Sequence, residues 1–360
     1  MLKQLDYFPK IGLALVLSAV LALIATPFVM KLAKKVGAMD IPKDERRMHH
    51  VPIPRMGGLA IIFGFTVSVL LFVNLDTQTC GILAGAAVIA ALGIADDILA
   101  LRAMPKFIVQ LLAAAIVVLH GCRIEIFLGL HLPVWLSWIV SILWIVTITN
   151  AVNFIDGLDG LAAGVSAISA GTMLIVALLL LNSSNPLNVV IASAIMLASI
   201  VGACIGFIPY NFNPARIFMG DTGSTFLGFM LSSISIYGLF KTYAVISFLV
   251  PFLVLGLPIC DISFAVIRRL LHGQSPMHAD RGHIHHRLID MGLSQKQAVA
   301  ICYLISAVLG LAAVVLTDRN EMQMLILLAA VLLIGSISTR LVFQHWHPKK
   351  PEGDKTDEQN

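Results

Sequence analysis

Long apolar segments follow one another along almost the whole chain, and they constrain its fold more than any other feature. Hydrophobic residues make up 58% of the 360 residues and charged residues only 12%, which is about half the charge of a typical soluble domain. A membrane-spanning helix needs about 20 apolar residues, and several segments are near or below that length. Because lipid offers no partner to an unpaired backbone group, each spanning segment has to be helical. The sequence therefore predicts an all-α polytopic membrane protein with about eleven transmembrane helices, at 11–30, 57–74, 81–95, 105–120, 135–150, 161–181, 187–208, 223–240, 244–267, 297–316 and 322–343.

The basic residues are unevenly divided between the two sides of this arrangement. Nineteen of the 24 Lys and Arg residues fall on the side that includes the loop 31–56, and cytoplasmic loops carry an excess of such residues. We therefore expect the N-terminus outside and the C-terminus in the cytoplasm. The first apolar run is interpreted as a retained helix, because no convincing small-residue cleavage site ends it.

One integral-membrane domain is expected over residues 1–346, followed by a polar, disordered cytoplasmic tail at 347–360. The five cysteines lack metal-type spacing and are interpreted as small apolar fillers. A disulfide between Cys80 and Cys122 stays open.

Four polar residues stand between two strongly apolar runs in the stretch 150–164. They are two amides and two carboxylates: Asn150, Asn153, Asp156 and Asp159. An ionised Asp at the bilayer centre costs roughly 2.5–3.5 kcal/mol, which indicates that the cluster has a use. The two acids are three residues apart and would share a face of a helix, where their repulsion requires a cation between them, and the glycines of the same stretch allow backbone or ligand to approach closely. We expect a cytoplasm-facing site for a metal, a phosphate group, or both.

Two further acidic motifs fall on the same predicted side. Asp96-Asp97 ends the third apolar run, where one carboxylate could bind a metal and the other a substrate, although a solvated helix end would look the same. The motif 220–224 places Asp221 immediately before a helix, where an acid serves either an anion-binding turn or as the helix cap. Phe218 could stack on a base or pack in the core.

Histidines and basic residues gather in the predicted loop 268–296. His283, His285 and His286 stand near Arg281, and no Cys or paired acid is spaced to complete a zinc site with them. Contacts to a nucleotide diphosphate fit this composition better. The alternative is a surface loop whose histidines have no role.

Together these motifs supply oxygen ligands, amides and cationic donors at one edge of the membrane. Carboxylates suit Mg²⁺ or Mn²⁺, and phosphoryl transfer needs positioning and neutralisation of developing charge. We therefore favour an enzyme that joins a water-soluble donor to a lipid acceptor. An ion-coupled transporter would place its acids near the midplane with access from both faces, and a non-catalytic lipid-binding scaffold needs no clustered carboxylates. Asp261, inside the ninth run, is equally a functional candidate or a structural partner of another helix.

The motifs Asp96-Asp97, 150–162, 218–224 and 283–286 resemble those of the polyprenyl-phosphate N-acetylhexosamine-1-phosphate transferases over nearly all of the membrane region. The resemblance implies Mg²⁺-dependent transfer of a sugar-1-phosphate from a UDP-sugar to undecaprenyl phosphate, with release of UMP. It implies that Asp96 deprotonates or orients the lipid phosphate and that Phe218 and Asn211 hold the uracil and ribose. It assigns catalysis to Asp96, Asp97, Asp156 and Asp159. It assigns the metal to Asp221 and Asp97. It assigns substrate contacts to Asn150, Asn153, Gly157, Leu158, Asn211, Phe218, Arg281, His283, His285 and His286.

Within this family, the chain departs from the pentapeptide-transferase pattern at two places. It carries His-Ile-His-His and not three consecutive histidines, and it lacks the lysine that usually follows the first Asp pair, so Arg102 or Lys106 would supply that charge. These departures favour UDP-GlcNAc as the donor, for a cell-envelope glycan such as teichoic acid or O-antigen, over transfer of phospho-N-acetylmuramoyl-pentapeptide. Direct attack by the lipid phosphate is favoured over a covalent intermediate.

The resemblance also implies a location and partners. It places the enzyme in the bacterial cytoplasmic (inner) membrane with its active site on the cytoplasmic face. The implied partners are UDP-GlcNAc, undecaprenyl phosphate, membrane lipid and a second copy in a homodimer, with no nucleic acid.

Overall fold

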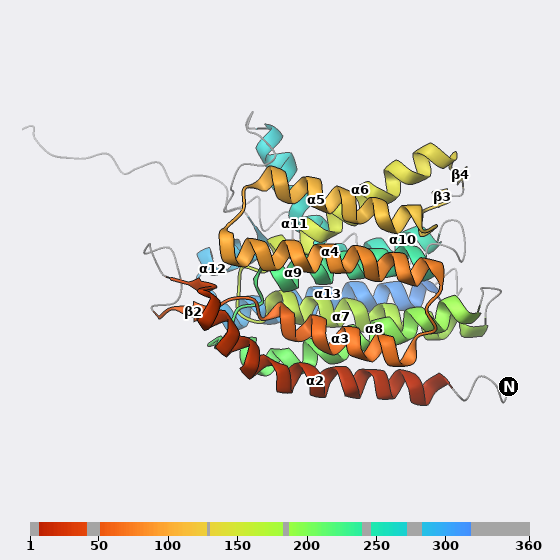
Figure 1. The fold of residues 1–360 in the computed structure, drawn as a ribbon. Coiled ribbons are helices and arrows are strands. Elements are labelled where there is room, and N and C mark those ends of the chain that lie inside the picture. Colours follow the sequence, from red (N-terminus) through yellow and green to blue (C-terminus); the bar gives the residue numbers. More distant parts are fainter. Residues whose placement is uncertain are drawn as a thin grey trace, which may run out of the picture.

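A computed structural model describes residues 7–41, 51–127, 130–182, 187–239, 246–271 and 283–317. They form a bundle whose longer helices have roughly aligned axes (Figure 1). The helices are α2 (Tyr7–Val36), α3 (Gly58–Phe72), α4 (Thr77–Leu99), α5 (Ala103–Leu119), α6 (Val134–Phe154), α7 (Leu161–Leu179), α8 (Leu187–Asn211), α9 (Gly220–Ile234), α10 (Ile246–Val254), α11 (Gly256–Leu271), α12 (Ile284–Asp290) and α13 (Gln295–Thr317).

Two small antiparallel hairpins join these helices. β1 (Met39–Asp40) pairs with β2 (Ile53–Pro54), and β3 (Ile126–Phe127) pairs with β4 (Leu130–His131). The two hairpins lie at opposite ends of the bundle (Figure 1). The structure is therefore mostly helical, as predicted, with short strands that the sequence did not indicate.

Six helices are long and apolar enough to cross a membrane: α2, α4, α6, α7, α8 and α13. The shorter helices α3 and α5 are also apolar. The predicted runs fall on helices wherever the structure describes them, whereas the run 322–343 and the tail 347–360 lie outside the described residues. The chain is a multi-pass membrane protein, and the total of about eleven spans and their orientation stay predictions.

The predicted span 244–267 is interrupted at Leu255, which separates α10 from α11, although helical hydrogen bonds from Leu255 to Pro251 and from Ile259 to Leu255 continue through this point. Pro258 has no backbone N–H to donate to the carbonyl of Val254, and its ring clashes with that carbonyl in a continuous helix. Gly256 at the break further weakens the helix. Pro258 and Gly256 are visible in the sequence, but average hydropathy does not register their effect on the backbone.

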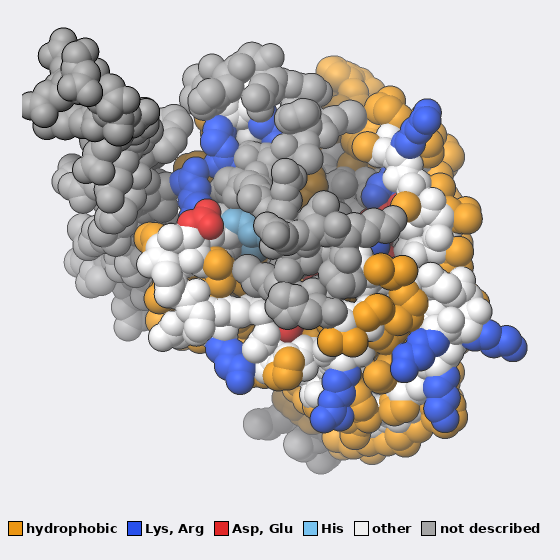
Figure 2. Space-filling view, turned by 90° about the vertical axis from the view of Figure 1, so that its left-hand side faces the viewer, with side chains coloured by type: hydrophobic (Ala, Val, Ile, Leu, Met, Phe, Trp, Pro, Cys, Tyr) orange, Lys and Arg blue, Asp and Glu red, His pale blue; other side chains and the backbone are white. Residues whose placement is uncertain are grey.

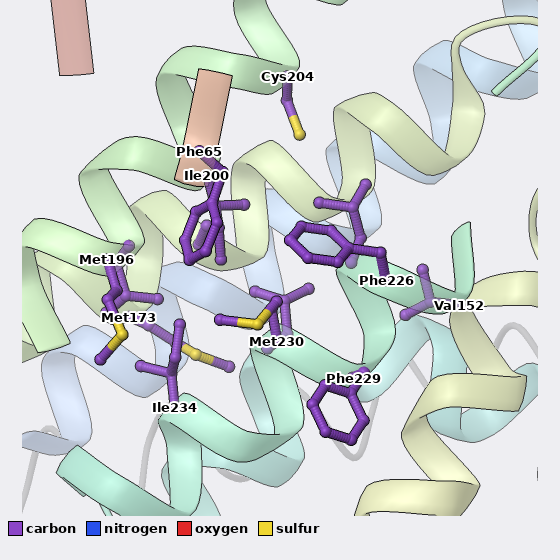
Figure 3. Packing of buried hydrophobic residues seen from close by; sticks show 14 of the residues in the cluster. Phe65, Val152, Met173, Met196, Ile200, Cys204, Phe226, Phe229, Met230 and Ile234 are labelled. Atoms are coloured by element: carbon purple, nitrogen blue, oxygen red, sulfur yellow. The ribbon is translucent and has the colours of Figure 1, made fainter. Parts of the chain in front are cut away.

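The core is built around α9, which packs against α3, α4 and α6. Its side chains Phe226, Phe229, Met230 and Ile234 are all at most 1% exposed, and Figure 3 shows them among residues from several other helices. The rings of Phe226 and Phe65 meet edge to face, with their centroids 5.5 Å apart. The start of α9 is thereby fixed by its surroundings.

Glycines bring this start against its neighbours backbone to backbone. A Cβ on Gly58 of α3 would collide with the backbone of Gly223, and a Cβ on Gly93 of α4 would collide with the backbone of Thr222. Small residues at helix interfaces permit such close approach in membrane proteins. The first turn of α9 is therefore held between the N-terminal end of α3 and the C-terminal end of α4.

We expect Gly93→Ala to lower the thermal unfolding midpoint of the protein in detergent. The added methyl group has to push α4 away from α9, at a cost of about 1–3 kcal/mol. Gly12→Ala in α2 is the matched control, because a Cβ at Gly12 meets nothing within 4 Å. Equal midpoints for the two variants, measured by scanning fluorimetry, would contradict the tight contact.

Candidate active site

Asp97, near the end of α4, holds the first turn of α9. Its Oδ1 accepts the backbone N–H of Asp221 at 3.0 Å, and its Oδ2 accepts the backbone N–H and the hydroxyl of Thr222 at 3.1 and 2.6 Å. Arg55 Nε lies 3.7 Å from Oδ1. Gly220 has a φ of +73°, and a Cβ there would collide with the Asp97 carboxylate, so this contact needs glycine. In this arrangement Asp97 positions Asp221 through the backbone.

Asp221 is the point at which α4, α5, α6 and α9 converge. Lys106 of α5 donates from Nζ to Asp221 Oδ2 at 3.0 Å and to Asp96 Oδ2 at 2.7 Å. Asn153 of α6 donates from Nδ2 to Asp221 Oδ1 at 3.1 Å and to Ser224 Oγ at 2.8 Å. The structure thus brings together the first acid pair, the central amide and the acid of the 220–224 motif, as the sequence led us to expect.

Lys106, and not Arg102, lies between the two carboxylates. Arg102 precedes the first turn of α5 and is exposed. Gln110, one turn after Lys106, is 4% exposed and accepts from Asn150 Nδ2 at 2.7 Å. Asn150 was predicted to contact substrate. In the structure its side-chain amide joins α6 to α5, one turn along α5 from Lys106.

Asp156 and Asp159 do not share a helix face, because α6 ends before them and the residues 155–160 form turns. Asp159 Oδ2 accepts the side-chain N–H of Asn213 at 2.9 Å and the backbone N–H of Ala215 at 3.0 Å. Asp159 thus holds the loop between α8 and α9, and its predicted catalytic role finds no support in these contacts. Residues three apart share a face only within a continuous helix, and α6 ends at Phe154.

Asp156 lies close enough to the acidic cluster to respond to its charge. Burial raises the pKa of its carboxyl to about 8, and the negative charges of Asp221 and Asp97 add to this effect. An ionised carboxylate beside two others needs a cation nearby. A metal or a cationic ligand would therefore stabilise the ionised form of Asp156.

Asp156 should make the metal-free protein less stable as the pH rises from about 4 to about 8. In this window the folded carboxyl keeps the proton that the unfolded one, with a pKa of 3.8, has released, so the folded state binds more protons and stability falls with pH. Thermal unfolding in EDTA at about pH 6 and about pH 8.5 should show a larger drop for the wild type than for Asp156→Asn. Parallel behaviour of the two proteins would contradict the raised pKa.

Asn211 and Phe218 border the loop between α8 and α9. Asn211 is 3% exposed; its Oδ1 accepts the N–H of Gly160 at 3.1 Å and its Nδ2 donates to the carbonyl of Ile217 at 3.0 Å. Phe218 donates its backbone N–H to the carbonyl of Pro54 at 2.9 Å, and its ring is half-buried. Asn211 is thus engaged within the fold, whereas Phe218 is partly accessible.

The histidine motif forms the start of α12, and it is tied to α11. Asp261 Oδ2 lies 2.8 Å from His283 Nδ1, and its Oδ1 accepts the backbone N–H of Ile284 at 2.7 Å. The ring of His283 also faces that of Phe154 at the end of α6, with centroids 5.5 Å apart. Asp261 was interpreted either as a functional residue or as a structural partner of another helix. Its contacts favour the second interpretation, and the helix that it contacts is α12, which carries the histidines.

His285 is packed against Gly157 in the turn after α6. It is 2% exposed, a Cβ on Gly157 would meet its Nε2, and this Nε2 has no hydrogen-bond partner in the described part of the chain. Burial lowers the pKa of His285 to about 3, so its imidazole is neutral. Leu158 is 5% exposed and belongs to the core, whereas Arg281 lies outside the described residues.

Sequence reasoning did not single out Tyr303 of α13. Its hydroxyl donates to the carbonyl of Gly160 at 2.6 Å, and its ring fills the space beside Gly164. The close approach that we expected at the glycines of 150–164 is therefore made by side chains of the protein. A lone Tyr in an apolar helix gives no signal of this kind.

The carboxylate oxygens of this cluster are of the kind that Mg²⁺ prefers. Among the residues that the structure describes, no three His, Cys, Asp or Glu side chains converge as a complete metal site. Mg²⁺ typically takes one or two carboxylates and completes its shell with phosphates and water. Of the two predicted ligands, Asp221 could serve in this way, whereas both oxygens of Asp97 accept hydrogen bonds from the start of α9. Asp156, which interacts electrostatically with Asp221, could complete the pair.

The surroundings of this cluster suit anionic ligands. Figure 2 looks on to the end of the bundle that carries β2 and α12, and it shows Lys and Arg side chains spread around this face, with His among them. Basic residues around a concentrated set of polar side chains attract phosphates from solution.

Known proteins are similar to this chain in sequence. Residues 79–239 match the family described as glycosyl transferase family 4. A protein of Bacillus subtilis named probable undecaprenyl-phosphate N-acetylglucosaminyl 1-phosphate transferase is 40% identical over 86% of this chain and 86% of its own length. The decaprenyl-phosphate N-acetylglucosaminephosphotransferase of Mycolicibacterium smegmatis is 34% identical over 88% of this chain and 85% of its length. The phospho-N-acetylmuramoyl-pentapeptide-transferase of Chlamydia trachomatis is 34% identical over 73% of this chain and 83% of its length.

The apolar helices and these relatives together show a multi-pass membrane enzyme of the sugar-phosphate transferase class. The coverage of these relatives shows the family, and the chain belongs to glycosyl transferase family 4. The resemblance that the four motifs indicated is confirmed.

Proposed function

We propose that this enzyme transfers N-acetylglucosamine-1-phosphate from UDP-GlcNAc to undecaprenyl phosphate in a Mg²⁺-dependent reaction that releases UMP. The observation that carries the proposal is the junction of Asp96, Lys106, Asn153 and Asp221, which joins four helices through charged and amide groups. Relatives named for GlcNAc-phosphate transfer cover more of the chain than the pentapeptide transferase does. This difference favours the GlcNAc donor.

The chemistry follows from these positions. A phosphate oxygen of the acceptor attacks the phosphorus that carries the sugar, the bond from this phosphorus to the UMP oxygen breaks, and the electron pair leaves with UMP. Lys106, between Asp96 and Asp221, neutralises phosphate charge in the transition state, and Asp96 orients the acceptor. Asp221 and Asp156 would hold Mg²⁺, which supplies further charge neutralisation when it is bound.

The ends of the helices support an enzyme over a transporter. Asp96 lies near the C-terminal end of α4, Asn153 near that of α6, and Asp221 at the N-terminal end of α9. A transporter site would lie near the middle of its helices. We place this end of the bundle at the cytoplasmic face of the bacterial inner membrane, where a nucleotide sugar is available. We infer that the product enters a cell-envelope glycan such as teichoic acid or O-antigen. We also infer that the enzyme is a homodimer.

The decisive experiment uses purified protein, undecaprenyl phosphate, Mg²⁺ and one donor at a time. UDP-GlcNAc should give lipid-linked GlcNAc with release of UMP, and EDTA should abolish the reaction. Product from UDP-MurNAc-pentapeptide alone would replace this proposal by the pentapeptide transferase. Absence of product from both donors would contradict transferase chemistry of this kind.

A further inference from the structure

The pair formed by Asp261 and His283 lies outside the charged cluster, and the chemistry described above makes no use of it. Asp261 is 2% exposed and His283 is 7% exposed. Both oxygens of Asp261 are engaged, at 2.8 Å from His283 Nδ1 and at 2.7 Å from the backbone nitrogen of Ile284. Burying a carboxylate costs free energy unless hydrogen-bond partners compensate for the lost water.

This contact favours one tautomer of His283. An ionised carboxylate can only accept hydrogen bonds, so the nitrogen at 2.8 Å, Nδ1, has to carry the proton. In the neutral ring, Nε2 is then the nitrogen with the free lone pair. One carboxylate thus sets both the tautomer of His283 and the starting point of α12.

The ring of His283 is also fixed in orientation. It stacks on His285 with centroids 5.7 Å apart and an angle of 6° between the planes. It also contacts the ring of Phe154 in α6, with centroids 5.5 Å apart. Phe154 directly follows Asn153, which contacts Asp221. The pair therefore connects α11 and α12 to the helix that supplies the central amide.

We infer that Asp261 is a positioning residue for the sugar-nucleotide half of the reaction, which acts through the tautomer and orientation of His283. This inference rests on the proposed function. Asp261 does not itself contact the substrate; it presents the histidine motif to the donor. The competing account is that Asp261 only caps α12, which makes it important for folding but indifferent to the tautomer.

Asp261→Asn distinguishes these accounts. The new amide can still accept the N–H of Ile284 through its oxygen, but it then presents N–H groups to His283 Nδ1, and the imidazole proton has to move to Nε2. We expect KM for the donor to rise roughly 10- to 100-fold, by analogy with the loss caused by removing a group that orients a metal-bound histidine. KM for undecaprenyl phosphate should stay within about twofold, because that half of the site is built by α4 and α5. Asp290→Asn, at the exposed end of the same helix α12, is the matched control and should leave both constants unchanged.

Two further measurements make the inference falsifiable. In a double-mutant cycle, Asp261→Asn should have less than about a twofold additional effect on KM in a His283→Ala background; an undiminished effect there would assign Asp261 a purely structural role. Nitrogen-15 spectra of histidine-labelled wild type should show the Nδ1–H tautomer of His283, and the other tautomer would overturn the inference even if no variant folds. If the wild type uses a different UDP-sugar, the same cycle is run with that donor, so an error in the proposed substrate is separable from an error here.

Discussion

Purified Asp221→Asn protein should release UMP roughly 10³-fold more slowly than the wild type, and the loss should appear in kcat. The amide keeps the shape of the side chain and an oxygen that can accept from Lys106 or Asn153, which lie 3.0 and 3.1 Å away in the wild type. What it removes is one negative charge at the junction of four helices. In the proposed mechanism, that charge holds a cation against the phosphates of the donor.

The unfolding midpoint separates this loss from a folding defect. The midpoint of Asp221→Asn in detergent should remain within a few degrees of wild type, because the backbone contacts of Asp97 with the start of α9 do not involve the substituted atoms. Near-normal turnover would exclude Asp221 as a metal ligand. Slow turnover together with a collapsed midpoint would assign Asp221 to the fold.

The second large effect is expected for Lys106→Gln, which should lower kcat by roughly 10²–10³-fold. Lys106 is the cation between Asp96 and Asp221. Without its ammonium group, the two carboxylates repel each other, and the phosphates of donor and acceptor meet one positive charge fewer. Turnover measured against salt concentration should also lose part of its salt dependence.

Arg102→Gln is the matched control for this variant. Arg102 is four residues away, carries the same charge and is exposed, so its loss should change kcat by less than about twofold, as for most exposed charges. Lys106→Arg should recover part of the activity, because it restores the charge but not the shape of the ammonium group. Equal losses for Lys106→Gln and Arg102→Gln would indicate that only the general positive charge of this end matters.

The sequence was informative about which residues matter and less so about what each of them contacts. Apolar runs and acidic motifs predicted a helical membrane protein and the meeting of Asp96, Asn153 and Asp221, because polar groups in so apolar a chain have to gather where they are satisfied. Lys106 and Arg102 could not be separated by their spacing from Asp97. Only the direction in which α5 leaves the preceding loop decides which of them reaches the acids.

The errors have a common physical origin in local backbone geometry. Asp156 and Asp159 were placed on one face by their spacing, but this argument holds only within a helix, and they lie in turns. The break between α10 and α11 lies inside a run of uniformly high hydropathy, so hydropathy alone did not predict it. Pro258, which cannot donate a helical hydrogen bond, was the sequence signal for it. Asp261 and His283 are 22 residues apart, and no periodic pattern connects an acid inside one helix to the first residues of another.

The backbone contacts of Gly58 and Gly93 with the first turn of α9 have a consequence for motion during turnover. Two helices that touch through main-chain atoms cannot slide or tilt without opening a void or a collision, since no flexible side chain is present to absorb the displacement. We therefore expect the acid-bearing half of the active site to stay rigid while substrates come and go.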